Sequence, residues 1–410
     1  METYLKVFTQ KKMAVLVLLG FSSGLPLALT FGTLQAMFKD AGMSLSEIGA
    51  VTLIGFPYTF KFLWAPLFDW FSPPFLGRRR GFILITQLAL IGAIVLMARF
   101  NPTTQSGLLI LSAVIVAFLS ASQDIVVDGY RSDVLEPHEL GAGASVFVLG
   151  YRIGMLVSGA FALILSDHLP WSTVYTLMAP FMIIGILAVL WSGPEPKITP
   201  PRTLTEAVVS PFLAFFREKG LQGTVLLLSL IILYKLPDAF AGAMTTPFLM
   251  DIGFAKTDIG VMNKGLGLLA TIVGGLFGGA ILAGIGLYRS LWVFGILQGV
   301  SNLVFTALAL AGPSTLGLFL AVGIENLSGG MGSTAFVALL MSLTQRQYSA
   351  TQYALFSSLA SITSRVIGPV AGSLAETLHF PVFYAVSSLG MIPGLVLLWM
   401  GRRYFLAHPE

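Results

Sequence analysis

The segments Ala65-Pro-Leu-Phe-Asp69 and Gly77-Arg-Arg-Arg80 are the most informative stretch of this chain, because they join two long apolar runs at 47–69 and 80–99. A carboxylate closes the first run and three arginines open the second, so opposite charges meet at one end of neighbouring helices. We expect these groups to latch a gate at that end; they are Asp69, Arg78, Arg79 and Arg80. The alternative is that the arginines only anchor the chain at a membrane surface.

The rest of the chain is apolar enough for a membrane protein. Hydrophobic residues make up 56% and charged residues 10%, with a mean hydropathy of +0.86. A membrane-spanning helix needs about 20 apolar residues. Twelve such runs predict an all-α fold of 12 transmembrane helices in a lipid bilayer: 13–37, 47–69, 80–99, 106–132, 141–165, 172–192, 222–249, 258–283, 289–310, 314–341, 350–375 and 381–401.

The most polar connection divides these runs into two sets of six. We expect a six-helix bundle at 1–192, a cytoplasmic linker at 193–220 and a second six-helix bundle at 221–410. Fifteen lysines and arginines fall on the side of the N-terminus and three on the other side. Because cytoplasmic loops carry the excess of basic residues, both termini and the linker are predicted to be cytoplasmic.

Composition excludes several other functions. The chain has no cysteine, and its four histidines fall in predicted loops or tails. We therefore expect no metal site, no cofactor and no catalytic nucleophile with a histidine base, so the chain is not predicted to be an enzyme. The net charge of +4 is spread over loops, which gives no basic patch suited to nucleic acid.

Charged residues inside the apolar runs indicate a transporter. A charge at bilayer depth costs several kcal/mol and normally faces a partner, a substrate or a water-filled path. Nine of them predict a polar cavity through the membrane: Lys61, Arg152, Lys235, Lys264, Arg365, Asp124, Asp128, Asp238 and Glu325. The five cations outnumber the four anions, so an anionic or zwitterionic solute is favoured over an organic cation.

In the first six runs, Asp124 and Asp128 lie four residues apart on one helix face. Asp124 is our first prediction for a proton-coupling carboxylate, and Asp128 is a further one. Two structural alternatives stay open. Asp124 can pair with Arg152, and Asp128 can pair with Arg131 or with the gate loop.

In the last six runs, Lys235 and Asp238 flank Pro237, which invites a kink. They are either a substrate element or a local ion pair. Glu325 is the second prediction for proton coupling, and with Arg365 it forms either a buried bridge or a site pair. Lys264 either meets an anionic substrate or extends outward to the membrane surface. The predicted substrate-binding residues are Lys61, Gln123, Tyr151, Arg152, Lys235, Asp238, Asn263, Lys264, Asn326, Gln352 and Arg365.

The gate segment resembles the signature loop of the major facilitator superfamily, G-x-L-x-D followed by G-R-x-x. That resemblance implies two pseudosymmetric six-helix bundles with the substrate site between them. The equivalent loop of the second bundle is degenerate, since no acidic residue occurs between Asp258 and Glu325. The latch is therefore expected to belong to the first bundle.

Runs in both halves closely resemble the AmpG muropeptide permease family: Leu19-Gly-Phe-Ser-Ser-Gly-Leu-Pro-Leu-Ala-Leu-Thr30, Lys61-Phe-Leu-Trp-Ala-Pro66, Ser120-Ala-Ser-Gln-Asp-Ile-Val127, Leu149-Gly-Tyr-Arg-Ile-Gly-Met-Leu-Val-Ser-Gly159, Val261-Met-Asn-Lys-Gly-Leu-Gly-Leu-Leu-Ala-Thr271, Glu325-Asn-Leu-Ser-Gly-Gly-Met-Gly332 and Ala350-Thr-Gln-Tyr-Ala354. The resemblance implies a monomeric, proton-coupled importer in the inner membrane of Gram-negative bacteria. Its substrate would be N-acetylglucosaminyl-1,6-anhydro-N-acetylmuramic acid and its peptides, which are recycled and linked to β-lactamase induction. The rival hypotheses are an importer of siderophores or acyl-CoA, and a sensor that binds fragments without moving them.

Overall fold

The computed structural model describes residues 7–43, 51–196, 198–254, 258–259 and 262–406, and within these ranges the chain is helical without a strand. The elements of the first half are α2 (Lys11–Thr30), α3 (Gly32–Asp40), η1 (Val51–Gly55), α5 (Phe56–Phe60), η2 (Lys61–Leu63), α6 (Ala65–Trp70), α7 (Arg78–Met97), α8 (Ser106–Val134), η3 (Pro137–Glu139), α9 (Leu140–Leu156), η4 (Val157–Phe161), α10 (Ala162–Ser166), α11 (Trp171–Met178), η5 (Ala179–Met182) and α12 (Ile183–Trp191). Helix α13 (Leu204–Leu233) leads into the second half. That half consists of α14 (Leu236–Asp251), η6 (Met262–Gly267), α16 (Leu268–Ile285), α17 (Leu287–Ala311), α18 (Thr315–Ser342), η7 (Arg346–Tyr348), α19 (Ser349–Ser388), α20 (Met391–Met400) and α21 (Arg403–Leu406).

Most of the predicted membrane runs coincide with helices. Among the described residues, nine helices are long and apolar enough to cross a membrane, or ten if α18 and the bent segment after it count as one span. The run at 47–69 is instead divided among η1, α5, η2 and α6. Pro57 and Pro66 lie at the starts of α5 and α6, and proline removes a backbone donor and ends the preceding helical turn. The count of twelve stays a prediction.

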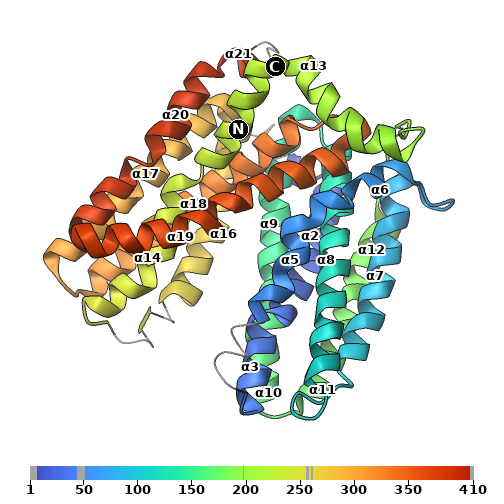
Figure 1. The fold of residues 1–410 in the computed structure, drawn as a ribbon, viewed down its shortest axis with the longest axis horizontal. Coiled ribbons are helices and arrows are strands. Elements are labelled where there is room, and N and C mark those ends of the chain that lie inside the picture. Colours follow the sequence, from blue (N-terminus) through green and yellow to red (C-terminus); the bar gives the residue numbers. More distant parts are fainter. Residues whose placement is uncertain (1–6, 44–50, 197, 255–257, 260–261, 407–410) are drawn as a thin grey trace.

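The elements of the two halves gather in two groups that meet at one end (Figure 1). That end carries both chain termini, α6, α21 and the start of α13, and it is called the latch end below. Helices α9 and α16 pack together across the two halves at small residues. A Cβ on Gly279 would lie 2.9 Å from the Gly141 carbonyl oxygen, so any side chain there would push the halves apart. The domain boundaries 1–192, 193–220 and 221–410 stay predictions.

Close packing of α2 on α9 depends on two pairs of glycines, and the two members of each pair are four positions apart in the chain. Cβ atoms on Gly20 and Gly24 would lie 2.2 and 2.1 Å from the carbonyl oxygens of Phe147 and Tyr151. In return, Cβ atoms on Gly150 and Gly154 would lie 1.9 and 2.2 Å from backbone oxygens of α2. Small residues at this spacing let helix backbones approach within a membrane. This contact fixes Tyr151 and the neighbouring Arg152 beside α2.

The predicted linker contains a helix. Residues 204–219 form the first part of α13, and Gly220 breaks the helix with φ 69° and ψ 169°. Glycine adopts this left-handed region without the cost of a Cβ. The second part of α13 then enters the second half and ends at Leu233, so a further break separates it from α14 next to Pro237. The helix is thus interrupted directly before Pro237, where a kink was expected.

Candidate functional site

The latch residues of the first half form a buried network of two aspartates and two arginines. Arg79 Nη2 lies 2.6 Å from Asp69 Oδ1, and Arg79 Nε lies 3.0 Å from Asp133 Oδ2. Arg78 Nη2 lies 3.3 Å from the same Asp133 oxygen. All four side chains are buried. Their formal charges balance, which a buried ionic cluster requires.

The same network crosses to the second half at the start of α19. Asp69 Oδ2 accepts hydrogen bonds from the Thr351 backbone N–H at 2.8 Å and from the Thr351 hydroxyl at 2.6 Å. A carboxylate that lies against the first turn of a helix, as Asp69 does at α19, also complements the helix dipole. The Ser349 hydroxyl accepts from Arg79 at 2.8 Å and donates to Asp133 at 2.6 Å.

Arg78 completes the crossing by donating to the backbone carbonyls of Arg346 and Gln347, at 3.0 and 3.1 Å. The first half therefore supplies both the arginines and the carboxylates, and the second half supplies hydroxyl and backbone groups. Breaking such a buried cluster by removing one charge typically costs about 3–5 kcal/mol, because the partner is left uncompensated. The network holds the two halves together at the latch end.

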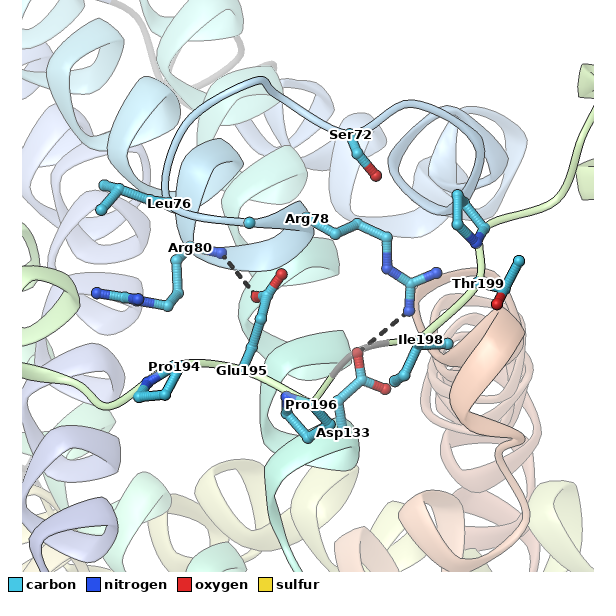
Figure 2. Close-up of a pocket in the computed structure, with 12 residues that line it drawn as sticks. Ser72, Leu76, Arg78, Arg80, Asp133, Pro194, Glu195, Pro196, Ile198 and Thr199 are labelled. Carbon is cyan, nitrogen blue, oxygen red and sulfur yellow. Dashed lines mark hydrogen bonds and ion pairs between the residues drawn. The ribbon is translucent and has the colours of Figure 1, made fainter.

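Arg80 differs from the prediction that it belongs to the latch. Its guanidinium donates to the Val189 carbonyl at 3.0 Å, within the first half. In Figure 2, Arg78 points toward Asp133 and Arg80 points away from it. Three consecutive residues on a helix diverge by about 100° each, so they cannot all face one partner. Arg80 therefore braces α7 against α12.

Glu195 is a latch-end residue that the sequence analysis did not identify. Its carboxylate accepts from the backbone N–H of Arg79 at 2.9 Å. It also accepts from the backbone N–H of Arg80 at 3.2 Å (Figure 2). It thus satisfies free donors at the start of α7. Glu195 and the prolines around it line a cavity of about 520 Å³ with Arg78, Arg80 and Asp133. The cavity is part of the latch region.

A second layer of charge lies beneath the latch. Lys61 Nζ is 3.4 Å from Asp128 Oδ2, and Arg131 Nη2 is 2.9 Å from Asp128 Oδ1. The same Arg131 nitrogen donates to the Tyr353 hydroxyl of the second half at 2.6 Å. The Arg131 guanidinium carbon also lies 4.2 Å from the centre of the Phe147 ring. Of the alternatives for Asp128, pairing with Arg131 is the one the structure has.

Asp124 lies one helical turn before Asp128 and has a different environment. Its Oδ1 is buried and has no hydrogen-bond partner among the described residues. Buried hydroxyls of Ser23, Tyr58 and Ser120 likewise lack a partner there. A buried polar atom without a hydrogen bond is costly, so a group of them indicates a place for a solute, water or proton. The structure gives no ion pair between Asp124 and Arg152.

Two predicted substrate residues of the first half lie near this group, and one does not face it. Tyr151 and Arg152 are partly exposed on α9. Gln123 is completely buried and donates to the Ser22 carbonyl at 3.1 Å, so it joins α8 to α2. Gln123 Oε1 is buried and has no hydrogen-bond partner among the described residues. The role of Gln123 in substrate binding stays a prediction.

The second half has its own polar cluster at the break before α14. Lys235 pairs with Asp238 and donates to the Ser333 hydroxyl at 3.1 Å. Gln298 donates to the same Asp238 oxygen at 3.2 Å. The ion-pair alternative for Lys235 and Asp238 is therefore present, but both side chains stay about a quarter exposed, at 21% and 26%. The pair can still contact a solute.

Glu325 lies on α18 near this cluster, where the charges of Asp238 and Lys235 act on it. Its Oε2 accepts from Asn326 at 2.7 Å, and Asn326 Oδ1 accepts from the Thr271 hydroxyl at 3.1 Å. The side chains of Asn263, Lys264 and Arg365 lie outside the described residues, so the proposed pairing of Glu325 with Arg365 stays a prediction.

Gln352, a predicted substrate-binding residue, makes its hydrogen bonds at the latch end. Its amide donates to the Pro211 carbonyl at 3.0 Å and accepts from the Gln345 backbone N–H at 2.6 Å. Both partners lie at the latch end, and Gln352 is buried. Gln352 belongs to the second turn of α19, which faces α13 there. It joins α19 to the linker helix, away from the charges of the membrane interior.

Four residues of the latch end were not identified from the sequence: Asp133, Glu195, Ser349 and Thr351. Ser349 and Thr351 begin a long apolar run, which is the usual signal of a helix start. Arg131 was named only as an alternative partner of Asp128, and its contact with Tyr353 was not foreseen. The partners of Asp133 on α7 and of Arg131 on α19 are more than 50 residues away, so no local pattern reveals them.

The arrangement suits a membrane carrier. A charge-balanced latch closes one end, and polar groups with unsatisfied hydrogen bonds lie deeper in each half. Among the described residues, no group of three or more histidine, cysteine, aspartate or glutamate side chains could hold a metal ion. Residues 16–369 match the family model described as Major Facilitator Superfamily. The chain therefore belongs to this superfamily of membrane transporters.

Relatives narrow the family further. The anhydromuropeptide permease of Escherichia coli (strain K12) is 49% identical over 404 residues, which cover 98% of this chain and 82% of that protein. An uncharacterized protein of Haemophilus influenzae is 37% identical and covers 96% of this chain and 95% of its own length. The putative transporter AmpG 4 of Rickettsia felis is 30% identical, and the match covers 97% of this chain and 98% of that protein. The chain is a member of the AmpG permease family.

Solved structures with little sequence similarity share the fold. The human organic anion transporter MFSD10 (TETRAN) superposes with a TM-score of 0.72 at 17% identity, covering 95% of this chain and 99% of that chain. A bacterial homologue of the iron transporter ferroportin in an outward-facing state superposes with a TM-score of 0.64 at 17% identity. That match covers 96% of this chain and 99% of that chain. The predicted family, the predicted major facilitator fold and the prediction of a transporter and not an enzyme are confirmed.

Proposed function

We propose that this protein imports anhydromuropeptides across the bacterial inner membrane by proton-coupled alternating access. The substrates are N-acetylglucosaminyl-1,6-anhydro-N-acetylmuramic acid and its peptides. Their import serves peptidoglycan recycling and is linked to β-lactamase induction. The protein works as a monomer, with both termini and the latch end on the cytoplasmic side.

The observation that carries this proposal is the 49% identity to the E. coli anhydromuropeptide permease over 98% of this chain. The cations within the predicted membrane runs support it, because stem peptides carry carboxylates. Lys61, Arg152 and Lys235 in the described part of the site, with Lys264 and Arg365, bind these carboxylates during transport. Asp238, Asn326 and Tyr151 contact the polar groups of the remaining substrate.

We assign proton coupling first to Asp124. Glu325 is the second candidate for this role and Asp128 is the third. Asp124 carries an oxygen without a hydrogen-bond partner among the described residues, whereas Lys61 and Arg131 hold both oxygens of Asp128. A proton on Asp124 lowers the negative charge that acts on Lys61. Lys61 is then freer to leave Asp128 for a substrate carboxylate, and the layer beneath the latch loosens. This order of events links proton binding at Asp124 to opening of the latch end.

The test is uptake of labelled N-acetylglucosaminyl-anhydromuramyl tripeptide into proteoliposomes, with and without an inward proton gradient. We expect accumulation above equilibrium only with the gradient, and exchange of internal for external substrate without it. Competition with a ferric siderophore or acyl-CoA should have no effect. Uptake that these solutes block would favour the other importer hypothesis. Saturable binding without any substrate-dependent proton flux would identify a sensor.

A further inference from the structure

The first part of α13, residues 204–219, carries an apolar surface for which the proposed transport cycle has no use. The segment is about 24 Å long at 1.5 Å per residue. It lies at the latch end, before the break at Gly220 turns the chain into the second half (Figure 1). Five of its apolar side chains are 40 to 45% exposed: Val208, Val209, Phe212, Leu213 and Phe216.

This helix has three distinct faces. Ala207, Pro211 and Phe215 repeat every four residues and are buried against the protein. At about 100° per residue, the five exposed apolar side chains cover the next arc of roughly 140°. Glu206, Ser210 and Arg217 occupy the arc beyond it. A helix with a protein face, an apolar face and a polar face fits the boundary between a membrane and water.

The exposed apolar face continues into surface that faces lipid. Directly after the break, Leu221 and Val225 are 71% and 56% exposed on a helix long and apolar enough to cross a membrane. Exposed apolar side chains on such a helix contact lipid chains. Exposed apolar side chains therefore occur on both sides of the break, on the spanning part of α13 and on the first part. This distribution favours the bilayer over a soluble partner as the occupant.

Basic side chains surround the same helix. Arg202 and Arg217 are exposed near its two ends. The C-terminal α21 packs beside the break, where Arg403 donates to Gln222 at 3.4 Å and Tyr404 donates to the Lys219 carbonyl at 3.3 Å. Arg402 and Arg403 are also exposed. Basic groups next to an apolar helix face attract anionic lipid headgroups.

We propose that residues 204–219 dock on the anionic phospholipid surface of the leaflet at the latch end, with the apolar face among the acyl chains and the basic residues at the headgroups. The buried face of the helix contacts α19 next to the latch. Pro211 accepts from Gln352, and the Phe215 ring centre lies 5.3 Å from that of Phe356. Gln352 adjoins Thr351, which binds Asp69. Anionic lipid that holds this helix therefore stabilises the closed latch.

The docking is tested first by the depth of spin labels. The chain has no cysteine, so single labels can be placed without further changes. Leu213→Cys lies on the apolar face and the matched control Ser210→Cys on the polar face. In phosphatidylcholine vesicles with about 30% phosphatidylglycerol, we expect the Leu213 label to collide with dissolved oxygen and to be shielded from a water-soluble nickel chelate. The Ser210 label should show the reverse.

Two results would overturn the docking. One is a Leu213 label as open to the nickel chelate as the Ser210 label, which would place the apolar face in water. The other is shielding from both reagents that increases with protein density in the membrane, which would indicate a second copy or another protein on this face. Neither readout needs transport, so failure of the proposed transport function leaves this test intact.

The second measurement asks whether the lipid acts on the latch. Glu136→Cys with Arg346→Cys reports closure by cross-linking with a bifunctional methanethiosulfonate reagent, because the native side chains pair across the halves at 3.5 Å. The reagent spans the gap that two long side chains fill, which is wider than a direct disulfide allows. We expect faster cross-linking in anionic vesicles than in pure phosphatidylcholine. Leu213→Asp should lose this gain, whereas Ser210→Asp, with the same added charge on the polar face, should keep it. Equal cross-linking of the unaltered helix in both lipids contradicts the proposal.

Discussion

At the scale of single residues, Asp124 and Asp128 show how one helix face gives two carboxylates different tasks. Asp128 holds Lys61 with one oxygen and Arg131 with the other. Asp124 keeps an oxygen without a hydrogen bond among the described residues, one turn deeper in the membrane. A carboxylate that two cations hold directly is a structural element, whereas a buried carboxylate without a direct ion pair among the described residues is suited to exchange a proton.

Replacing Asp124 tests this assignment. We expect Asp124→Asn to abolish accumulation driven by a proton gradient, because an amide cannot take up and release the coupled proton. Counterflow exchange of labelled for unlabelled substrate should stay measurable, since it needs no net proton movement. Asp167→Asn, at an exposed position between α10 and α11, is the matched control. Gradient-driven accumulation that persists in Asp124→Asn would contradict the assignment.

Replacing Asp69 tests the latch at the same scale. Asp69→Asn leaves Arg79 without one of its two carboxylates and weakens the bonds to Thr351. Loss of a partner from a buried ionic cluster costs about 3–5 kcal/mol. We expect Asp69→Asn to destabilise the closed conformation of the latch by this amount relative to the open one. Spin labels at Ser72→Cys and Ser342→Cys, exposed at the latch end of each half, should move apart in double electron–electron resonance. An unchanged distance distribution would show that the latch does not hold the halves together.

At the scale of the elements, much of the fold could be predicted from the sequence, because apolar runs of sufficient length have few alternatives to a membrane helix. The division of the run at 47–69 was missed, since length and hydropathy outweighed Pro57 and Pro66. The helix at 204–219 was also missed. Its polar residues and the preceding prolines led to the prediction of a cytoplasmic linker without a stated helix, and the four-residue repeat of Ala207, Pro211 and Phe215 was overlooked.

The packing of α2 on α9 gives a test at this scale. We expect Gly150→Leu to separate the two helices, because even a Cβ there would lie 1.9 Å from the Val17 carbonyl oxygen. Overpacking typically costs about 1–3 kcal/mol or more, which corresponds to a thermal midpoint lower by about 5 °C. Gly92→Leu adds the same side chain where a Cβ has open space, and should leave the midpoint in detergent unchanged. Equal midpoints for both variants would contradict the packing account.

The candidate site could be predicted less completely than the helices. The sequence marked Asp69, Arg78 and Arg79 as latch residues, because charge beside an apolar run is conspicuous. It did not reveal that Asp69 binds Thr351, 282 residues later in the chain. Partners so distant depend on how the halves meet, and no local pattern encodes that. The helix contacts of Gln123 and Gln352 could not be foreseen for the same reason, since an amide in a membrane protein serves equally well to bind a solute or a neighbouring helix.

At the scale of the whole molecule, the two halves are joined at the latch end by charge, hydroxyls and small residues. Arg78 and Arg79 contact η7 and α19, while Gly141 of α9 lies against Gly279 of α16. A balanced ionic cluster can close tightly and still open when one of its charges is compensated elsewhere. Import by alternating access requires that these contacts open and close in every cycle.

The measurement that tests this account most directly is gradient-driven uptake by Glu136→Cys with Arg346→Cys, whose native side chains pair across the halves at 3.5 Å. Labelled anhydromuropeptide uptake is followed in proteoliposomes before cross-linking, after cross-linking with a bifunctional methanethiosulfonate reagent, and after reduction. We predict accumulation in the untreated protein, none once the cross-link locks the latch end, and recovery when reduction cleaves the cross-link. Each single-cysteine variant should be unaffected by the same treatment. Undiminished accumulation by the fully cross-linked protein would contradict import by alternating access through this end.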